Sequence, residues 1–253
     1  MNQNHNPDID TYNDILVHKL KNRSLNRIKR FANIVLMSNN ITSIDALSDY
    51  TNIRYITFYN VDLRNINIEG KYPPNLVKMK LYQCVNPITN FPNIIECLEI
   101  ESCKFNTPVF NFSDNLKHLI LNNCDYQFPL DNLPHNLINF ELIYYSNEYK
   151  YTLDHLPQGL QKLSITGYYN NSVDNLPNTL REFTITVHPL KYNSPVYINL
   201  DMLPDSIEIL LIRTNYSRIT KLPTNLKDLR MYKKHPDYDM IKEIFPNIKD
   251  SFY

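Results

Sequence analysis

One ten-residue pattern recurs along the chain and constrains its fold more than any other feature. It has the form L-P-x-x-L-x-x-L-x-I and reads LPHNLINFEL from Leu133, LPQGLQKLSI from Leu156 and LPNTLREFTI from Leu176. Looser copies extend it in both directions. We number each unit from the first apolar residue of its core, and these residues are Phe31, Ile53, Leu76, Ile95, Leu116, Leu137, Leu160, Leu180, Ile207 and Leu226. Ten cores about 21 residues apart predict a repeat solenoid.

The spacing within each core predicts a strand. Positions 4 and 6 fall on one side of an extended chain, and positions 3, 5 and 7 fall on the other. One unit is too small to bury its apolar residues alone. Stacked units join positions 1, 4 and 6 into one interior and line their strands up as a parallel sheet.

The first unit shows the type of repeat. Its residues Phe31, Ile34, Leu36, Asn39, Ile41 and Ile44 fit L-x-x-L-x-L-x-x-N-x-L-x-x-L, so the chain resembles the leucine-rich repeats. The predicted fold is an α/β repeat solenoid: a leucine-rich-repeat horseshoe with a concave parallel β-sheet, an irregular or 3-10 convex side and short capping helices.

Position 9 predicts how each strand ends. It is expected to turn inward and bond to backbone groups where it is small or polar. Those residues are Asn39, Cys84, Cys103, Cys124 and Asn215. Elsewhere it is Val61, Tyr145, Tyr168, His188 or Lys234, which predicts looser turns in the second half.

A second element lies between the cores. It reads FNTPV at 105–109, YQFPL at 126–130, YKYTL at 149–153, YNNSV at 169–173 and YNSPV at 192–196. Most copies lead into Asp-x-Leu-Pro, at Asp131, Asp154, Asp174 and Asp201, where the aspartates are expected to accept backbone N–H bonds in turns. Over roughly residues 72–231 the combined motif resembles the FNIP repeat, a leucine-rich-repeat variant abundant in large DNA viruses and amoebae. The resemblance implies an interaction scaffold and no catalysis.

Proline placement predicts the side opposite the sheet. Eight of the 16 prolines lie in or beside the x-P-x-x-L step. Proline fixes φ and lacks an N–H, so it suits an irregular edge better than a sheet. We therefore expect extended or 3-10 turns there and little α-helix.

The repeats divide the chain into three parts: an N-terminal helical cap over 1–30, ten repeats over 31–235 and a C-terminal cap over 236–253. A short helix is expected within 236–245, and an eleventh core is expected from Ile248. Residues 13–31 also resemble the first two helices of an F-box, although the Leu-Pro start is missing and the repeats leave no room for a third helix. Two interpretations stay open: a plain cap, or an F-box remnant of a substrate-recognition subunit of a ubiquitin ligase.

Composition excludes several function classes. Only Gly70, Gly159 and Gly167 are present, and neither GxGxxG nor GxxxxGK[ST] can be formed from them. No CxxC pair, apolar signal segment or 18-residue apolar run occurs. The 26 basic and 26 acidic side chains balance, which argues against nucleic-acid binding. We therefore predict a cytoplasmic non-enzyme with no cofactor, no metal and no membrane contact.

The concave face is the expected binding surface for a protein partner. Tyrosine and arginine are enriched at binding hot spots. The predicted partner-binding residues are Tyr59, Lys80, Tyr82, Glu99, Glu101, Asn122, Glu141, Arg213 and Arg230, and Tyr144 at position 8 is expected on the same face. An enzyme with an unrecognised site is the alternative, and its turnover would depend on Glu99 or Glu101.

Charge is unevenly spread along the chain. Residues 1–84 carry 11 basic and 7 acidic side chains, residues 85–212 carry 6 and 14, and residues 213–253 carry 9 and 5. In a solenoid, sequence order is spatial order. The acidic middle predicts a partner with a basic surface, and the sequence does not predict the oligomeric state.

Overall fold

A computed structural model describes residues 15–17, 33–37, 47–65, 72–85, 91–105, 112–188 and 197–251. Several predicted features lie outside these residues: Phe31, Asn39, the FNTPV segment after residue 105, the YNSPV segment and most of the N-terminal cap. The main strands are β1 (Ile15–Val17), β2 (Asn33–Met37), β3 (Tyr55–Tyr59), β4 (Lys78–Tyr82), β5 (Cys97–Glu101), β6 (His118–Asn122), β7 (Asn139–Tyr149), β8 (Lys162–Tyr169), β9 (Glu182–Val187), β11 (Ile209–Ile212), β13 (Asp228–Met231) and β14 (Lys249–Asp250).

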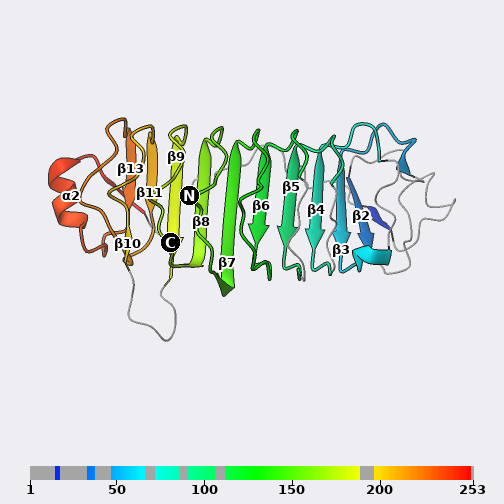
Figure 1. The fold of residues 1–253 in the computed structure, drawn as a ribbon, viewed down its shortest axis with the longest axis horizontal. Helices are drawn as coiled ribbons and strands as arrows, with labels where there is room; N and C mark the ends of the chain where they lie inside the picture. Colours follow the sequence, from blue (N-terminus) through cyan, green and yellow to red (C-terminus); the bar gives the residue numbers. More distant parts are fainter. Residues whose placement is uncertain are drawn as a thin grey trace.

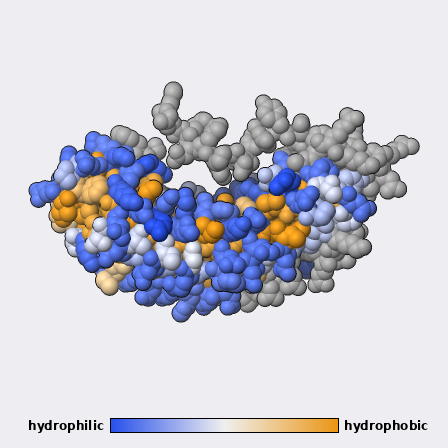
Figure 2. All heavy atoms as spheres, turned by 90° about the horizontal axis from the view of Figure 1, so that it is seen from above, coloured by the Kyte–Doolittle hydropathy of each residue, from blue (hydrophilic) through white to orange (hydrophobic). Residues whose placement is uncertain are grey.

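These twelve strands form one parallel sheet in chain order, β1-β2-β3-β4-β5-β6-β7-β8-β9-β11-β13-β14 (Figure 1). Each of the ten predicted cores supplies one strand, from β2 to β13. Seen from above, the described residues form an arc (Figure 2). The predicted leucine-rich-repeat solenoid is confirmed.

The interior follows the predicted positions. In β3, Ile56 and Phe58 at positions 4 and 6 are buried, whereas their neighbours are only half-buried. Ile53 at position 1 of the same unit is also fully buried. The register keeps equal positions opposite each other, for example Ile56 opposite Met79. The apolar positions therefore stack from unit to unit into one continuous core.

The proline steps form turns that directly precede the strands. The carbonyl of Pro73 accepts a hydrogen bond from the N–H of Leu76 (3.1 Å), which closes a β-turn just before the core. The same bond follows Pro92, Pro134, Pro157, Pro177, Pro204 and Pro223. Among the described residues the helices are only the 3-10 turn η2 (Leu63–Asn65) and the helix α2 (Tyr238–Ile244), so the prediction of little helix is confirmed.

The element between the cores is also built into the interior. Its aromatic first residue is buried in four described copies, at Phe105, Tyr126, Tyr149 and Tyr169. Its aliphatic fifth residue is buried as well. These residues are Leu130, Leu153 and Val173. The rings of Phe105 and Tyr126 meet edge to face at 5.3 Å, so the aromatic position links adjacent units.

In the first described units, each strand ends in a sharp turn at position 8. Asn60, Gln83, Ser102 and Asn123 stand there, with φ of 51°, 53°, 53° and 50°. This left-handed backbone directs the next residue inward. Val61, Cys84, Cys103 and Cys124 are accordingly buried at position 9.

The units of β7, β8 and β9 behave differently. Their strands continue past position 7, and the alternation of buried and half-buried residues in β8 runs as far as Tyr169. Position 8 is therefore the inward residue, and Tyr144 and Val187 are buried there. The prediction of looser turns is wrong for these units, which have longer strands instead. The placement of Tyr144 on the exposed face is wrong for the same reason.

The two ends differ from expectation in detail. Ile15–Val17, where we predicted a helix, is the strand β1, and Ile15 lies opposite Ile34 of β2. At the other end, α2 lies within the predicted helical stretch. The strand β14 follows it, but Lys249 pairs with Arg230 at position 5 of its unit. Ile248 therefore lies opposite position 4, three positions later than predicted.

Candidate functional site

The candidate site is the face of the sheet that points away from the core, called here the sheet face. It is formed by positions 3, 5 and 7 of each strand, which are half-buried or exposed in β3 to β9. Backbone hydrogen bonds between strands fix the spacing of these side chains. A partner would therefore meet a surface that is already ordered, which lowers the entropic cost of binding.

Tyr59 and Tyr82 stack on this face at position 7 of β3 and β4. Their ring centroids are 5.0 Å apart and their planes differ by 18°. The ammonium of Lys80 lies 5.6 Å from the centre of the Tyr82 ring. The structure thus brings together three of the predicted binding residues.

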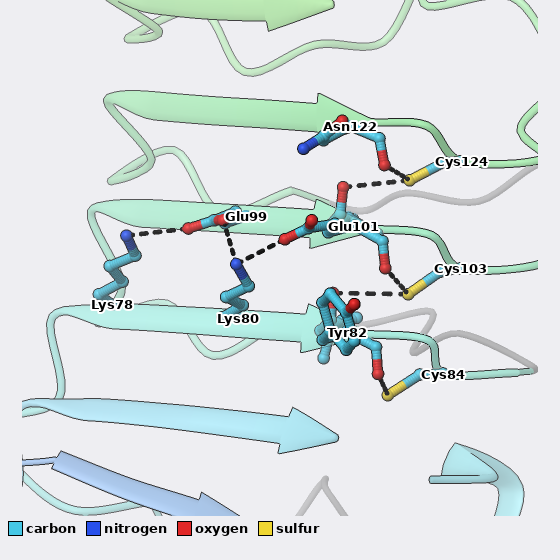
Figure 3. Close-up of polar contacts among 11 residues, drawn as sticks. Lys78, Lys80, Tyr82, Cys84, Glu99, Glu101, Cys103, Asn122 and Cys124 are labelled. Carbon is cyan, nitrogen blue, oxygen red and sulfur yellow. Dashed lines mark hydrogen bonds and ion pairs between the residues drawn. The ribbon is translucent and has the colours of Figure 1, made fainter. Parts of the chain in front are cut away.

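An ion-pair network joins β4 to β5 beside this stack (Figure 3). Lys78 Nζ lies 3.0 Å from Glu99 Oε2, and Lys80 Nζ lies 2.6 Å from Glu101 Oε2. Lys80 also pairs with Glu99. Because two lysines meet two glutamates, the group is neutral as a whole. The predicted residues Lys80, Glu99 and Glu101 largely satisfy one another.

The pKa values follow from these contacts. Partial burial disfavours the charge of Lys80, but hydrogen bonds to Glu101 and Glu99 outweigh it and raise the lysine pKa. Burial likewise disfavours the Glu99 carboxylate, yet its bonds to Lys80 and Lys78 lower its pKa. Both groups stay charged at neutral pH. These shifts are those of a paired surface network, in which each charge is stabilised by its neighbours.

Asn122 and Glu141 continue the row toward the middle of the sheet. Asn122 lies opposite Glu101 of β5 and Ile143 of β7. Glu141 lies opposite Ile120 and Ser164, and no ion pair involves its carboxylate among the described residues. The centre of the sheet face is therefore acidic at Glu141 and otherwise carries little charge.

Arg213 and Arg230 lie far from the other predicted residues. Arg213 Nε donates to Ser251 Oγ at 2.9 Å, and Arg230 Nη2 donates to Asp228 Oδ2 at 2.9 Å. Five strand steps separate β5 from β11, which is roughly 24 Å. The nine predicted residues are thus a row along the sheet face and do not form a single compact site.

Cys84, Cys103 and Cys124, called here the cysteine column, lie just beyond the ends of the strands that carry the ion-pair network (Figure 3). Cys84 Sγ lies 3.3 Å from the Phe58 carbonyl, and Cys124 Sγ lies 3.1 Å from the Ile100 carbonyl. In each case the acceptor is position 6 of the preceding unit. Burial raises the pKa of Cys124 to about 12, so its thiol stays protonated and can donate. The predicted backbone-bonding role is confirmed for these cysteines.

Asn215 does not share that role. The neighbouring Thr214 at position 8 is fully buried instead, and its hydroxyl donates to the Val187 carbonyl at 2.8 Å. This unit therefore uses position 8 as its inward polar residue.

Two aspartates accept backbone N–H bonds from the next unit: Asp201, from the predicted set of turn aspartates, and Asp205, from outside it. Asp201 accepts from the N–H of Lys221 at 3.0 Å, and Asp205 accepts from the N–H of Thr224 at 3.0 Å. Both carboxyls have lowered pKa values in consequence, although burial opposes the shift most strongly at Asp201. These aspartates connect repeats.

A buried serine–histidine pair lies near the C-terminus. The oxygen of Ser217, on the short strand β12 (Ser217–Arg218), is 2.8 Å from His235 Nε2. His235 Nδ1 accepts the N–H of Asp237 at 3.1 Å, so the ring proton is on Nε2 and is donated to the serine. To act as a general base on Ser217, His235 would need a free lone pair on Nε2, the nitrogen that faces the serine. Burial lowers the pKa of His235 to about 4, which fits a neutral structural histidine.

The described part of the chain lacks two further kinds of feature. No group of three or more His, Cys, Asp or Glu side chains that could hold a metal ion occurs there. None of the helices in the described ranges is long and apolar enough to cross a membrane.

The sequence prediction missed three aromatic residues on the sheet face. Tyr145, Tyr168 and His188 stand at position 9 of the units of β7, β8 and β9, where we predicted looser turns and no exposed side chain for a partner. Because these strands continue straight, position 9 points outward, and Tyr145 is 54% exposed. The signal was present in the sequence as three successive large rings at a position where the cysteine turns carry small residues.

No protein-family model and no curated protein matches the sequence. Among solved structures, the chain is similar to YopM from Yersinia enterocolitica, with 17% identity and a TM-score of 0.42 over 79% of this chain and 46% of that protein. It is also similar to CroV588, described as a novel circular LRR protein, with 17% identity and a TM-score of 0.44 over 79% and 36%. The chain spans less than half the length of either protein. Likeness at this level says nothing about function.

Proposed function

We propose that this protein is a non-enzymatic scaffold that binds a protein partner on its sheet face. The observation that carries the proposal is the continuous row of half-exposed side chains held in register by twelve parallel strands. The stacked Tyr59 and Tyr82 supply aromatic contact area without further ordering.

We also propose that the repeats are of the FNIP type. The support is physical: the aromatic and aliphatic positions of the element between the cores are the ones that are buried. A cytoplasmic location is part of the same proposal. All four cysteines are free, and those of the column act as donors, which suits a reducing compartment.

Site-specific photocrosslinking tests the surface. A photoreactive phenylalanine at Thr57 or Ser164 would stand on the sheet face, and one at Asp131 or Asp174 would stand on the exposed proline turns as a matched control. We expect the two sheet-face positions to crosslink the same protein in cells and the turn positions to leave it uncrosslinked. Equal crosslinking from both sides would contradict the assignment of the surface.

The non-enzymatic part has its own test. The network of Glu99 and Glu101 is the acidic group that we identified as an alternative catalytic site. Any turnover by the purified protein that falls on Glu99→Gln would contradict the scaffold function.

A further inference from the structure

Two buried thiols of the cysteine column lie side by side in adjacent units. Cys84 follows β4 and Cys103 follows β5, and the parallel bridge between Val85 and Lys104 continues the ladder just beyond them. The Cys84 carbonyl accepts the Lys104 N–H at 3.1 Å, so the two cysteines stand opposite each other with both side chains in the core. In-register residues of parallel strands have Cα atoms about 4.8 Å apart, a separation that a disulfide can span.

The Cys103 sulfur already leans toward the unit that carries Cys84 (Figure 3). It lies 3.5 Å from the Leu81 carbonyl oxygen of that unit and 3.4 Å from the Glu101 carbonyl oxygen of its own. The Cys84 sulfur lies 3.3 Å from the Phe58 carbonyl oxygen, in the unit before. Rotation of the Cys84 side chain away from that carbonyl would therefore turn its sulfur toward Cys103.

The two thiols differ in acidity. The Cys103 thiol stabilises the thiolate of Cys84 and lowers the pKa of Cys84, although burial opposes the shift. The same contact, together with burial, raises the pKa of Cys103. Cys84 is therefore the sulfur that reacts first with an oxidant. Once Cys84 is oxidised, its contact no longer holds the proton on Cys103, and Cys103 becomes the second nucleophile.

Burial limits the access of an oxidant to this pair, because each thiol is 1% exposed. Cys84 nevertheless stands between two exposed residues, Gln83 and Val85, at the end of its strand. Gln83 holds a left-handed backbone, with φ of 53°. Opening this one turn would uncover the sulfur without unfolding the sheet. A molecule as small as hydrogen peroxide could then reach it.

We propose that Cys84 and Cys103 form a reversible disulfide when the protein meets hydrogen peroxide. The Cys84 thiolate attacks one peroxide oxygen and the O–O bond breaks, which gives a sulfenic acid and hydroxide. The Cys103 thiolate attacks the sulfenic sulfur, forms the S–S bond and releases the second oxygen as hydroxide. The two thiol protons neutralise the two hydroxides. Two thiols thus lose two electrons, and one peroxide becomes two water molecules.

The geometry makes this bond a switch that is easily reversed. Side chains of in-register residues run parallel with Cβ atoms about 4.8 Å apart, whereas those of a relaxed disulfide are about 3.8 Å apart. Strained disulfides are the readily reduced ones. The bond also takes the thiols from the carbonyls of Phe58 and Leu81 and pulls on the strand ends that carry Tyr82 and Glu101. Oxidation would therefore alter the sheet face at two of the predicted binding residues.

Peptide mapping of the oxidised full-length protein tests the proposal. The protein is treated with hydrogen peroxide, blocked with N-ethylmaleimide, digested and analysed by mass spectrometry. We expect the peptides of Cys84 and Cys103 to be joined, with a loss of about 2 Da and of two of the four free thiols, and dithiothreitol should reverse both changes. Cys124→Ala is the matched control within the column and should form the same bond. In Cys103→Ala, dimedone should instead trap Cys84 as the sulfenic acid.

Several results would overturn the proposal. Oxidation of the half-buried Cys97 alone would show that the column is out of reach of peroxide. A bond between Cys103 and Cys124 as the main product would show that the pair is wrongly chosen, and a bond that forms only in urea would show that the folded protein does not make it. Circular dichroism confirms that each variant is folded.

Hydrogen exchange tests the switch. The oxidised protein should exchange amides faster over 78–85 and 97–104 than the reduced protein, and unchanged exchange would show that the bond does not act on the sheet face. None of these measurements requires a partner. The disulfide therefore stands or falls independently of the scaffold function, which the photocrosslinking tests.

Discussion

The units of β3 to β6 and those of β7 to β9 start from the same core and end differently. In the first region, position 8 takes a left-handed backbone and a small residue at position 9 turns inward. In the second, position 8 is the inward residue: Gly167, with a φ of 103°, holds it in β8, and aromatic or β-branched residues, Tyr144 and Val187, hold it in β7 and β9. Such side chains favour extended backbone, so the strands run on. A strand thus ends early when position 9 supplies the inward side chain, and it continues when position 8 does.

This difference has a functional consequence. Where position 9 turns inward, its side chain closes the core, as Cys103 does. Where the strand continues, position 9 comes out on the sheet face and becomes available to a partner, as Tyr145 does. The same repeat position is structural in one region and exposed in the other.

The largest expected effect comes from replacing Gly167, the glycine of β8, in the units of β7 to β9. In Gly167→Ala the new Cβ would lie 1.8 Å from the Tyr144 carbonyl oxygen, and the residue would keep a φ of 103° that alanine rarely adopts. Because the clash is with backbone, β7 and β8 must separate locally. We expect a loss of more than about 3 kcal/mol in the free energy of unfolding, measured by urea denaturation with circular dichroism.

Gly159→Ala is the matched control. Its Cβ would lie 3.1 Å from the His135 carbonyl oxygen, and its φ is not in the left-handed region. We expect a loss below about 1 kcal/mol. If the two variants were equally stable, the close approach of β7 to Gly167 would not require a glycine.

The core was predictable because it depends on periodicity alone. Ile53, Ile56 and Phe58 share one face of any extended chain with this spacing, so positions 1, 4 and 6 could be assigned before the structure was known. The strand order followed as well, because short connections stack consecutive units in sequence. Neither argument depends on how a strand ends.

The site was harder to predict, because it depends on local backbone choices. Position 9 was expected to turn inward at Cys84, Cys103 and Cys124, whereas at the large residues, such as Tyr145, only looser turns were predicted. The sequence does not show the left-handed turn that directs these residues inward, nor its absence before Tyr145. Arg213 was likewise assigned to the face by position alone, and its bond to Ser251 depends on how the C-terminal strand returns to the sheet.

Lowering the pH is expected to destabilise the C-terminal units more than the units that carry the cysteine turns. The folded pKa of His235, about 4, is below its ordinary value of 6.5, so the unfolded chain takes up the proton more readily. The stability from the neutral ring is fully present above pH 6.5 and is lost as the pH falls toward 4. Between pH 7.5 and 4.5 we expect a loss of about 2–3 kcal/mol.

The variant His235→Gln isolates this contribution, because it keeps an amide donor but does not titrate. Carboxyls with lowered pKa values, such as that of Asp228, also reduce the free energy of unfolding in acid, but they do so equally in wild type and variant. Hydrogen exchange at pH 4.5 should show faster exchange in β11 to β13 than in β4 to β6. An unchanged acid response in the variant would show that the Ser217–His235 pair is not the sensitive group.

A smaller effect is expected within the cysteine turns. Cys103→Ala removes the thiol contacts to the carbonyls of Leu81 and Glu101 and leaves a small void. We expect a loss of about 1–2 kcal/mol in urea denaturation, and less for Cys103→Ser, whose hydroxyl can donate in the same place. The control is Cys97→Ala on the sheet face, where we expect less than about 0.5 kcal/mol. Equal losses at both sites would contradict a special role for the column.

The smallest effect tests the left-handed turn itself. Gln83 holds a φ of 53°, which costs a residue with a side chain roughly 1 kcal/mol. Gln83→Gly relieves that cost but adds about 0.5–1 kcal/mol of backbone entropy to the unfolded state. The variant should therefore be as stable as wild type or up to about 0.5 kcal/mol more stable. Thr166→Gly, in the extended backbone of β8, gains no such relief and should lose about 1 kcal/mol in the same assay. If glycine were equally harmful at both positions, the left-handed backbone at Gln83 would carry no strain for glycine to relieve.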